Sequence, residues 1–175
     1  ATNMAPHNLT ECCDAICAYI DNPEITIEEL MHHIKGPDFP TGGIIQGRQG
    51  IKDAFETGRG RIVIRSKTEI EVNESGRETI VVTEIPYMVN KREMIEKIAE
   101  LVETKKVDGI AYINDETTMK GVRVVIRLKK DANANVVLNM LYKYSPLQSS
   151  FSVNNVALVN GRPRTLNLKQ LIKYF

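Results

Sequence analysis

The chain has 175 residues, of which 42% are hydrophobic and 26% charged, a composition typical of a globular protein with one large or two small folded units. No apolar run approaches the ~20 residues of a membrane-spanning helix, and no secretion leader is recognisable. We therefore expect neither an integral membrane protein nor a secreted one. Because the chain begins at Ala1 and stops at Phe175 within a helical pattern, we expect it to be a piece of a longer protein.

The net charge of +1 hides an uneven distribution of charge along the chain. Residues 1–34 contain six acidic residues and no lysine or arginine, whereas residues 35–67 contain seven basic and three acidic residues. Residues 68–120 are acidic again, and residues 121–175 contain nine basic residues and one acidic residue. If the two basic blocks converge in space, they form a surface that binds a polyanion.

Helical signals open the chain. Asn8 and Glu11 have the spacing of a capping box, and a helical apolar stripe follows, formed by Leu9, Cys13, Ile16 and Ile20. A second, shorter helix is predicted after Thr26. A third is predicted within residues 48–58, where Gly58 closes it.

Residues 61–72 alternate between apolar and charged side chains, which predicts a strand with one charged face. A turn at residues 73–76 and a returning strand at residues 77–85 complete a hairpin. The clearest helix is predicted at residues 90–105, capped by Asn90. The remaining predicted elements are strands at 109–115 and 122–129, a helix at 134–144, a strand at 149–161 and the start of a helix at 167–175.

From residue 77 onward the predicted order of elements is β-α-β-β-α-β, which is the order of the ferredoxin-like split βαβ fold. We therefore predict an α+β protein with an antiparallel sheet. Residues 1–60 form a helical approach with a glycine- and arginine-rich stretch, residues 61–160 form the α+β core, and residues 161–175 form a return segment.

Residues 42–65 contain six glycines and four arginines, as in a phosphate-binding loop. Neither a P-loop nor a dinucleotide fingerprint matches: no lysine–hydroxyl pair follows the glycines, and the "GRG" at 58–60 opens a strand. Arginines beside glycines can nevertheless approach phosphates closely. The candidate polyanion-binding residues are Arg48, Arg59, Arg61, Arg65 and Lys67. The alternative is a solvated basic surface.

No catalytic or metal-binding residue is predicted. His32 and His33 are adjacent on a helix and diverge by ~100°, so they do not converge on one ion. His7 stands before a helix cap. The three cysteines lie within six residues of one helix and have no second ligand cluster. No serine, cysteine or aspartate stands beside a plausible base.

Five blocks of the sequence together resemble the DNA gyrase A-subunit family of type II topoisomerases, with the A subunit of topoisomerase IV as the near relative. The resemblance runs in order from Ala1 to Phe175. It implies the tower domain, which follows a winged-helix region and precedes a long coiled coil. The blocks are ATNMAPHNL, GPDFPTGGIIQGRQGI, GRGRIVIRSKTEIE, EIPYMVNKREMIEKIAELV and NLKQLI.

The resemblance also implies a division of labour. The nucleophile of the family is a tyrosine directly preceded by arginine, and none of the six tyrosines here follows an arginine. The segment is therefore expected to grip DNA without cleaving it, while Mg2+ and ATP are used on the gyrase B subunit. The implied partners are double-stranded DNA, the B subunit, and a second A subunit in an A2B2 enzyme of the bacterial cytoplasm. No membrane partner is expected, and this segment alone is expected to be monomeric.

Three alternatives stay open: a topoisomerase IV tower, a stand-alone ferredoxin-like module that binds RNA or a small ligand, and an independent enzyme. RNA recognition on such a sheet uses exposed aromatic residues on the central strands. The segments "IVVTEI" and "VRVVIRL" contain none, which counts against the RNA-binding module.

Overall fold

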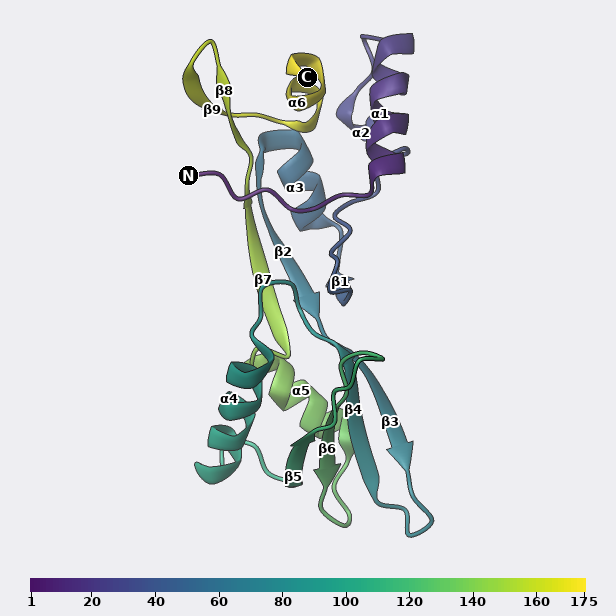
Figure 1. The fold of residues 1–175 in the computed structure, drawn as a ribbon, viewed down its shortest axis with the longest axis vertical. Coiled ribbons are helices and arrows are strands. Elements are labelled where there is room, and N and C mark those ends of the chain that lie inside the picture. The colour runs from purple at the N-terminus through teal and green to yellow at the C-terminus, as the bar shows by residue number, and fades with distance from the viewer. The chain divides into compact units, whose positions relative to one another are not determined.

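The computed structural model describes residues 1–175 as six helices and nine strands (Figure 1). The helices are α1 (Leu9–Asp21), α2 (Ile27–Leu30), α3 (Gln49–Thr57), α4 (Lys91–Glu103), α5 (Ala134–Tyr144) and α6 (Leu168–Tyr174). The strands are β1 (Ile44–Gln46), β2 (Arg59–Arg65), β3 (Lys67–Val72), β4 (Glu78–Glu84), β5 (Ile110–Asp115), β6 (Val124–Leu128), β7 (Gln148–Asn154), β8 (Val156–Val159) and β9 (Arg162–Thr165). None of the helices combines the length and apolar character that a membrane crossing requires.

The chain divides into two compact units. Unit 1 consists of Ala1–Pro40, Ile45–Val63 and Ser150–Phe175, and unit 2 consists of Thr41–Ile44 and Ile64–Ser149. The boundaries fall inside β1, β2 and β7, which pair in the order β1-β2-β7. Both units therefore draw on segments that are far apart in the sequence.

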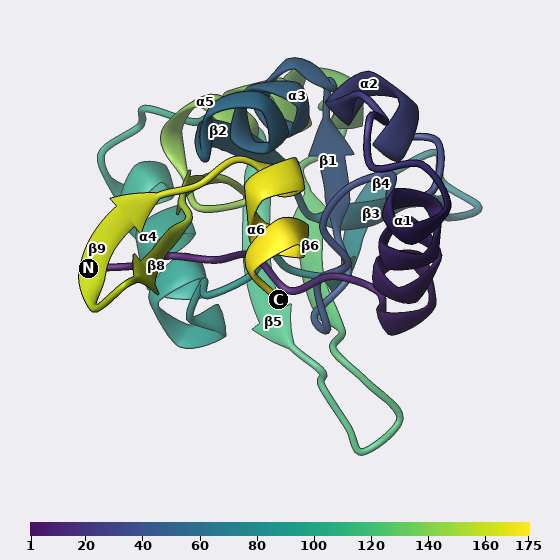
Figure 2. The same ribbon diagram turned by 90° about the horizontal axis from the view of Figure 1, so that it is seen from above.

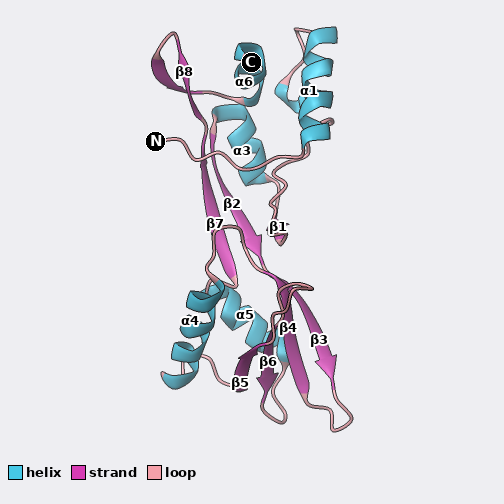
Figure 3. Cartoon of the chain, viewed as in Figure 1, coloured by secondary structure: helices cyan, strands magenta, loops and turns pink.

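Unit 2 is built on a four-stranded antiparallel sheet with the order β3-β4-β6-β5 (Figure 3). Ile80 lies opposite Ile126, and both are fully buried on the face that receives α4 and α5. Ile98 of α4 and Leu141 of α5 belong to the same apolar cluster. The predicted α+β class with an antiparallel sheet is thereby confirmed.

The ferredoxin-like sheet order is not confirmed. Along the chain the elements follow the predicted β-α-β-β-α-β order from β4 to β7. A split βαβ sheet would place its last strand, β7, beside its first, β4. Here β3 occupies that edge of β4, and β7 pairs with β2 in another sheet. Because β3 and β4 are joined by a short turn, the local hairpin takes the edge that the distant strand would need.

The single strand predicted over residues 61–72 is wrong, because the chain breaks at Ser66. Strand β2 ends at Arg65 and β3 begins at Lys67, and the two belong to different sheets. Ser66 is buried, and its backbone N–H donates to the carbonyl group of Leu147 over 2.9 Å. The alternation of apolar and charged residues continues from β2 into β3, so the sequence pattern does not reveal the change of sheet at Ser66.

The connection between β5 and β6 extends away from the sheet of unit 2 (Figure 2). An isolated bridge between Thr118 and Gly121 closes its tip, where Met119 is fully exposed. The Oγ1 atom of Thr117 accepts a hydrogen bond from the backbone N–H of Arg123 over 3.1 Å. The connection is thus a narrow arm with its own hydrogen bonds.

Unit 1 contains α1, α2, α3, α6 and the β8–β9 hairpin. The apolar stripe predicted for α1 is largely uncovered: Leu9 and Ile20 are 78% and 68% exposed, and only Ala15 is buried. The hairpin turns at Asn160 and Gly161, which have φ angles of 53° and 76°. Positive φ at both positions is typical of the tight turn that suits the twist of a two-stranded hairpin.

Candidate nucleic-acid interface

The glycines of residues 42–65 mainly allow α3 to lie close to β2. A Cβ atom on Gly50 would overlap the carbonyl oxygen of Arg61, and one on Gly60 would overlap the carbonyl oxygen of Gly50. Of the six glycines in this stretch, only Gly47 has open space where a side chain would stand. The glycines therefore serve packing of the chain on itself more than an open phosphate loop.

Arg59 and Arg61 project from the exposed face of β2. Successive side chains on a strand point to opposite faces, and the residues between and after them, Gly60 and Ile62, face α3. Ser152 on the neighbouring strand β7 is exposed as well. A face with two arginine side chains and a small polar neighbour leaves room for a phosphate backbone to approach.

Arg48 lies apart from these two arginines, at the start of α3. It lines a concavity together with His32 and Lys35, which follow α2, and with Lys52 of α3. The sequence did not single out Lys35 or Lys52. The spacing of Arg48 and Lys52, four residues apart on one helix, predicts a shared face, whereas the approach of Lys35 depends on how α2 meets α3.

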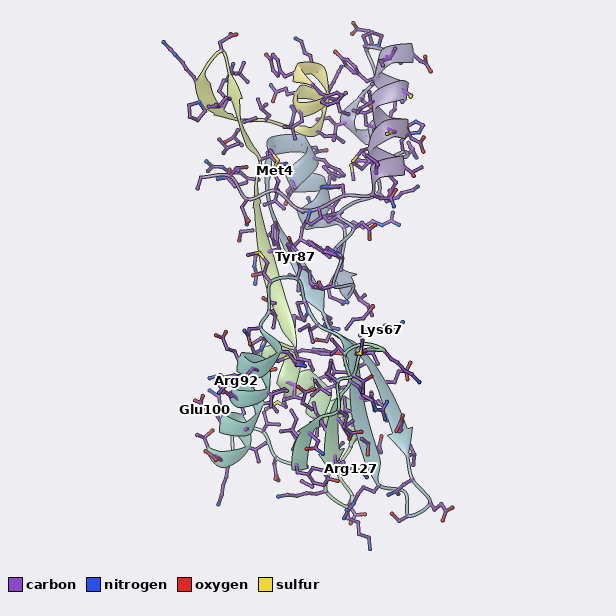
Figure 4. All side chains as sticks on the ribbon, viewed as in Figure 1. Met4, Lys67, Tyr87, Arg92, Glu100 and Arg127 are labelled. Carbon is purple, nitrogen blue, oxygen red and sulfur yellow. The ribbon has the colours of Figure 1, made fainter.

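Arg65 and Lys67 belong to unit 2. The Nε–H of Arg65 donates to Oε1 of Gln148 over 2.7 Å, and its guanidinium group lies 4.5 Å from the centre of the Tyr142 ring. These contacts hold Arg65 within unit 2. Lys67 (labelled in Figure 4), at the start of β3, is exposed and forms no ion pair, although it lies opposite Glu84 of β4 in the sheet.

Some lysines and arginines of the basic block after residue 120 are engaged by partners within the chain, and others are free to bind a ligand. Arg123 lies between Glu71 and Glu116, at 3.8 Å and 3.7 Å, and Lys129 lies 3.6 Å from Asp108. Other cations of unit 2 stack on tyrosine rings of the same unit: Lys106 and Lys143 near Tyr144, and Arg127 near Tyr112. The cations of unit 2 are therefore largely engaged by partners in the same unit.

Arg162 and Arg164 differ from that group. They alternate along β9, opposite Val159 and Ala157, so both side chains lie on the same face of the hairpin. Both are exposed and form no ion pair. They add a second pair of free arginines to unit 1.

His7 occupies a structural position in unit 1. Its Nδ1 lies 2.8 Å from the carbonyl oxygen of Ala5, and its ring lies 5.7 Å from that of Phe55. Burial lowers the pKa of His7, so the neutral ring is favoured. The ring borders an apolar cavity of about 230 Å³ whose other walls include Cys12, Ile16 and Phe175.

Two further titratable groups, Cys12 and Asp115, have shifted pKa values with local structural causes. Burial raises the pKa of the Cys12 thiol, which disfavours the reactive thiolate. Asp115 accepts from Thr117 and pairs with Lys91 at 2.9 Å; these contacts, the one with Thr117 above all, lower the pKa of Asp115. No three histidine, cysteine, aspartate or glutamate side chains lie close enough together to hold a metal ion.

The sequence model of one protein family, the A subunits of DNA gyrase and topoisomerase IV, matches residues 1–175. The chain belongs to this family. The similarity extends over the whole chain and includes both units. It confirms the resemblance that the five sequence blocks indicated.

Curated relatives support the gyrase side of the family. The chain is 59% identical to the DNA gyrase A subunit of Staphylococcus epidermidis (strain ATCC 12228) over 176 residues, which cover 100% of the chain and 20% of that relative. The protein of the same name from Staphylococcus aureus (strain MRSA252) is 58% identical with the same coverage. That of Clostridium acetobutylicum is 55% identical over 175 residues, 100% of the chain and 21% of the relative. The chain thus spans about a fifth of the length of these relatives.

Proposed function

We propose that this chain is the tower segment of a DNA gyrase A subunit, and that it grips duplex DNA without cleaving it. In the intact enzyme it would support ATP-dependent passage of one duplex through another, and hence supercoiling. The family model covers the A subunits of both enzymes, and the names of the relatives support gyrase over topoisomerase IV. The sheet of unit 2 departs from the ferredoxin-like order, so a stand-alone module of that fold has less support.

The observation that carries this proposal is the separation of charge within unit 1. Unit 1 contains nine lysines and arginines and nine acidic residues, yet only one ion pair, Lys52–Glu56, forms among them. The other six ion pairs of the chain lie in unit 2. Six of the nine acidic residues of unit 1 lie in the first 34 residues of the chain. Apart from Lys52, the cations of unit 1 therefore form no ion pair, which leaves them available to an external polyanion.

Backbone contacts are sufficient for such a grip. Lysine and arginine side chains neutralise phosphates irrespective of base sequence, and the released counterions make binding dependent on salt. Bending a duplex costs on the order of several kcal/mol, which contacts to its outer arms can offset. Arg48, Arg59 and Arg61 are the candidates in unit 1, with Lys67 and Arg65 as candidates in unit 2.

The remaining roles would belong to other parts of the enzyme. No tyrosine of this chain follows an arginine, so the nucleophile would come from outside the segment. Mg2+ and ATP would be used on the gyrase B subunit, and this segment would bind no cofactor. Its partners would be DNA, the B subunit, and a second A subunit in the bacterial cytoplasm. The segment alone would be a monomer in sedimentation.

A direct titration tests the proposal. A fluorescently labelled duplex of ~30 bp is titrated with the chain at two salt concentrations and in two unrelated base sequences. We expect weak binding that is equal for both sequences and falls steeply with salt. Absence of binding at low salt would contradict the proposed grip.

A further inference from the structure

A basic concavity lies within unit 1 between α2 and α3. It has a volume of about 380 Å³, and Met31 and Ile51 contribute its apolar part. Its polar rim combines side chains from three short stretches of sequence. They are Glu28 and His32 near α2, Lys35 in the following loop, and Arg48, Gln49 and Lys52 at the start of α3.

The cations of this concavity are poorly matched by acids. Lys35 and Arg48 are exposed and form no ion pair. Lys52 lies 4.0 Å from Glu56, and both side chains are about half exposed, so this pair contributes little. Glu28 is the one acidic residue among those that line the concavity. Three cations thus surround a hollow that is large enough for a phosphate group and that one carboxylate lines. Two more carboxylates lie near these cations: Glu56 pairs with Lys52, and Glu11 accepts from the backbone N–H of Lys35 over 2.7 Å.

We propose that this concavity seats one backbone phosphate of duplex DNA, held by Lys35, Arg48 and Lys52. This inference rests on the proposed function and extends its contacts beyond the arginines of the glycine-rich stretch. Three exposed cations hold an isolated phosphate weakly because water and salt screen them. The same contact becomes effective when the arginines of the glycine-rich stretch already hold other phosphates of the same DNA strand. Binding of one more phosphate in the concavity is then an intramolecular step.

The test compares two charge-matched double variants in the duplex titration. K35Q/K52Q removes two cations from the concavity. R92Q/K97Q removes two cations from α4, where each is paired with a glutamate at helical spacing. Each lost phosphate contact flattens the plot of log affinity against log salt by roughly 0.9, so K35Q/K52Q, which removes two of the three cations around the one phosphate, should flatten it by about 0.9. R92Q/K97Q should leave the slope unchanged.

A variant that should gain affinity complements this test, because a variant that fails to fold can lose DNA binding but cannot strengthen it. E28Q removes the acid from the concavity and should tighten duplex binding at low salt. If K35Q/K52Q matches R92Q/K97Q and E28Q has no effect while the unmodified chain binds DNA, the concavity is not a phosphate seat, although the proposed function stands. If the unmodified chain binds no DNA, the proposed function itself fails.

Inorganic pyrophosphate distinguishes a DNA phosphate from a small phosphorylated ligand. In calorimetric titration of the unmodified chain we expect no saturable binding of pyrophosphate at micromolar concentrations. Saturable one-to-one binding that K35Q/K52Q abolishes would overturn the assignment to DNA and make the concavity a small-ligand site.

Discussion

The backbone of Gly50 in α3 lies directly against the carbonyl group of Arg61 in β2, with no room for a side chain between them. This contact fixes how the helix that carries Arg48 meets the strand that carries Arg59 and Arg61. Gly60 repeats the arrangement from the strand side, against the carbonyl group of Gly50. The positions of the candidate arginines in unit 1 therefore depend on two glycines that bind nothing themselves.

Gly50→Ala tests this contact, because the substitution should destabilise the protein if the contact exists and stabilise it if the position is free. Alanine at a free helical position would stabilise the protein by up to about 1 kcal/mol relative to glycine. Overpacking against Arg61 costs about 1–3 kcal/mol, so the net change should be a loss. A loss of about 1 kcal/mol lowers the thermal midpoint by roughly 2–4 °C in a chain of this size. Lys52→Ala, at an exposed position of the same helix, is the control, and a rise in the midpoint of G50A would refute the contact.

Ile98→Asp tests the core of unit 2. Ile98 is fully buried between α4 and the sheet, so the new carboxylate would lack both water and a partner. We expect a loss of several kcal/mol, sufficient to abolish cooperative unfolding of unit 2 at room temperature. Lys97→Asp, one position away on the half-exposed side of α4, should shift the midpoint far less. Equal midpoints for the two variants in a thermal melt monitored by circular dichroism would contradict the burial of Ile98.

His7 predicts a specific pH dependence of stability. Its pKa in the folded protein is lowered from 6.5 by burial, so between the two values the unfolded chain binds more protons than the folded one. The free energy of unfolding should therefore fall as the pH drops below about 6.5. Urea unfolding between pH 8 and pH 5 should show a smaller fall in His7→Asn, while His33→Asn, at an exposed position, keeps the original fall. An unchanged pH dependence in H7N would count against a buried neutral His7.

The chain alone should neither cleave nor relax DNA. No tyrosine here has the arginine neighbour of the nucleophile implied by the family resemblance. Supercoiled plasmid incubated with the chain, magnesium, ATP and the intact gyrase B subunit should remain supercoiled and uncut on an agarose gel. Cleavage above the level of a control that lacks the chain would show that a nucleophile lies within these 175 residues.

Local patterns in the sequence predicted the elements of unit 2 well. Asn90 caps α4 as predicted, by accepting from the backbone N–H of Glu93, and Met94, Ile98 and Leu101 form the buried stripe of this helix. These features depend only on residues within one or two turns of each other. The sheet order does not, because the pairing of β3 and β7 is decided by competition between distant segments for the same edge.

Other misses have similar causes. The switch of sheets at Ser66 depends on its hydrogen bond to Leu147, eighty-one residues away in the sequence. Helical periodicity identified the apolar side of α1 but could not tell whether anything covers Leu9 and Ile20. By contrast, the Asn160-Gly161 pair is a recognisable sequence signal for a hairpin turn. The prediction of one continuous strand over residues 149–161 did not use this signal.

The candidate site was predicted as one group, and the structure divides it. Arg59 and Arg61 share a strand face, which strict alternation along β2 already indicates. Arg48 joins Lys35 and Lys52 in the concavity instead, since the meeting of α2 and α3 is a matter of tertiary packing. The contacts of Arg65 with Gln148 and Tyr142 also depend on tertiary packing, because these residues are far from Arg65 in the sequence, and local sequence patterns could not predict them.

The salt dependence of duplex binding by the triple variant R48A/R59A/R61A tests the central claim most directly. If each arginine neutralises one phosphate, the plot of log affinity against log salt should flatten by about 2.7 relative to the unmodified chain. The control R92A/K97A/R123A removes the same charge from ion-paired positions of unit 2 and should keep the original slope. If the slope is unchanged in the first variant, or flattened equally in both, these arginines do not contact phosphates and form only a solvated surface.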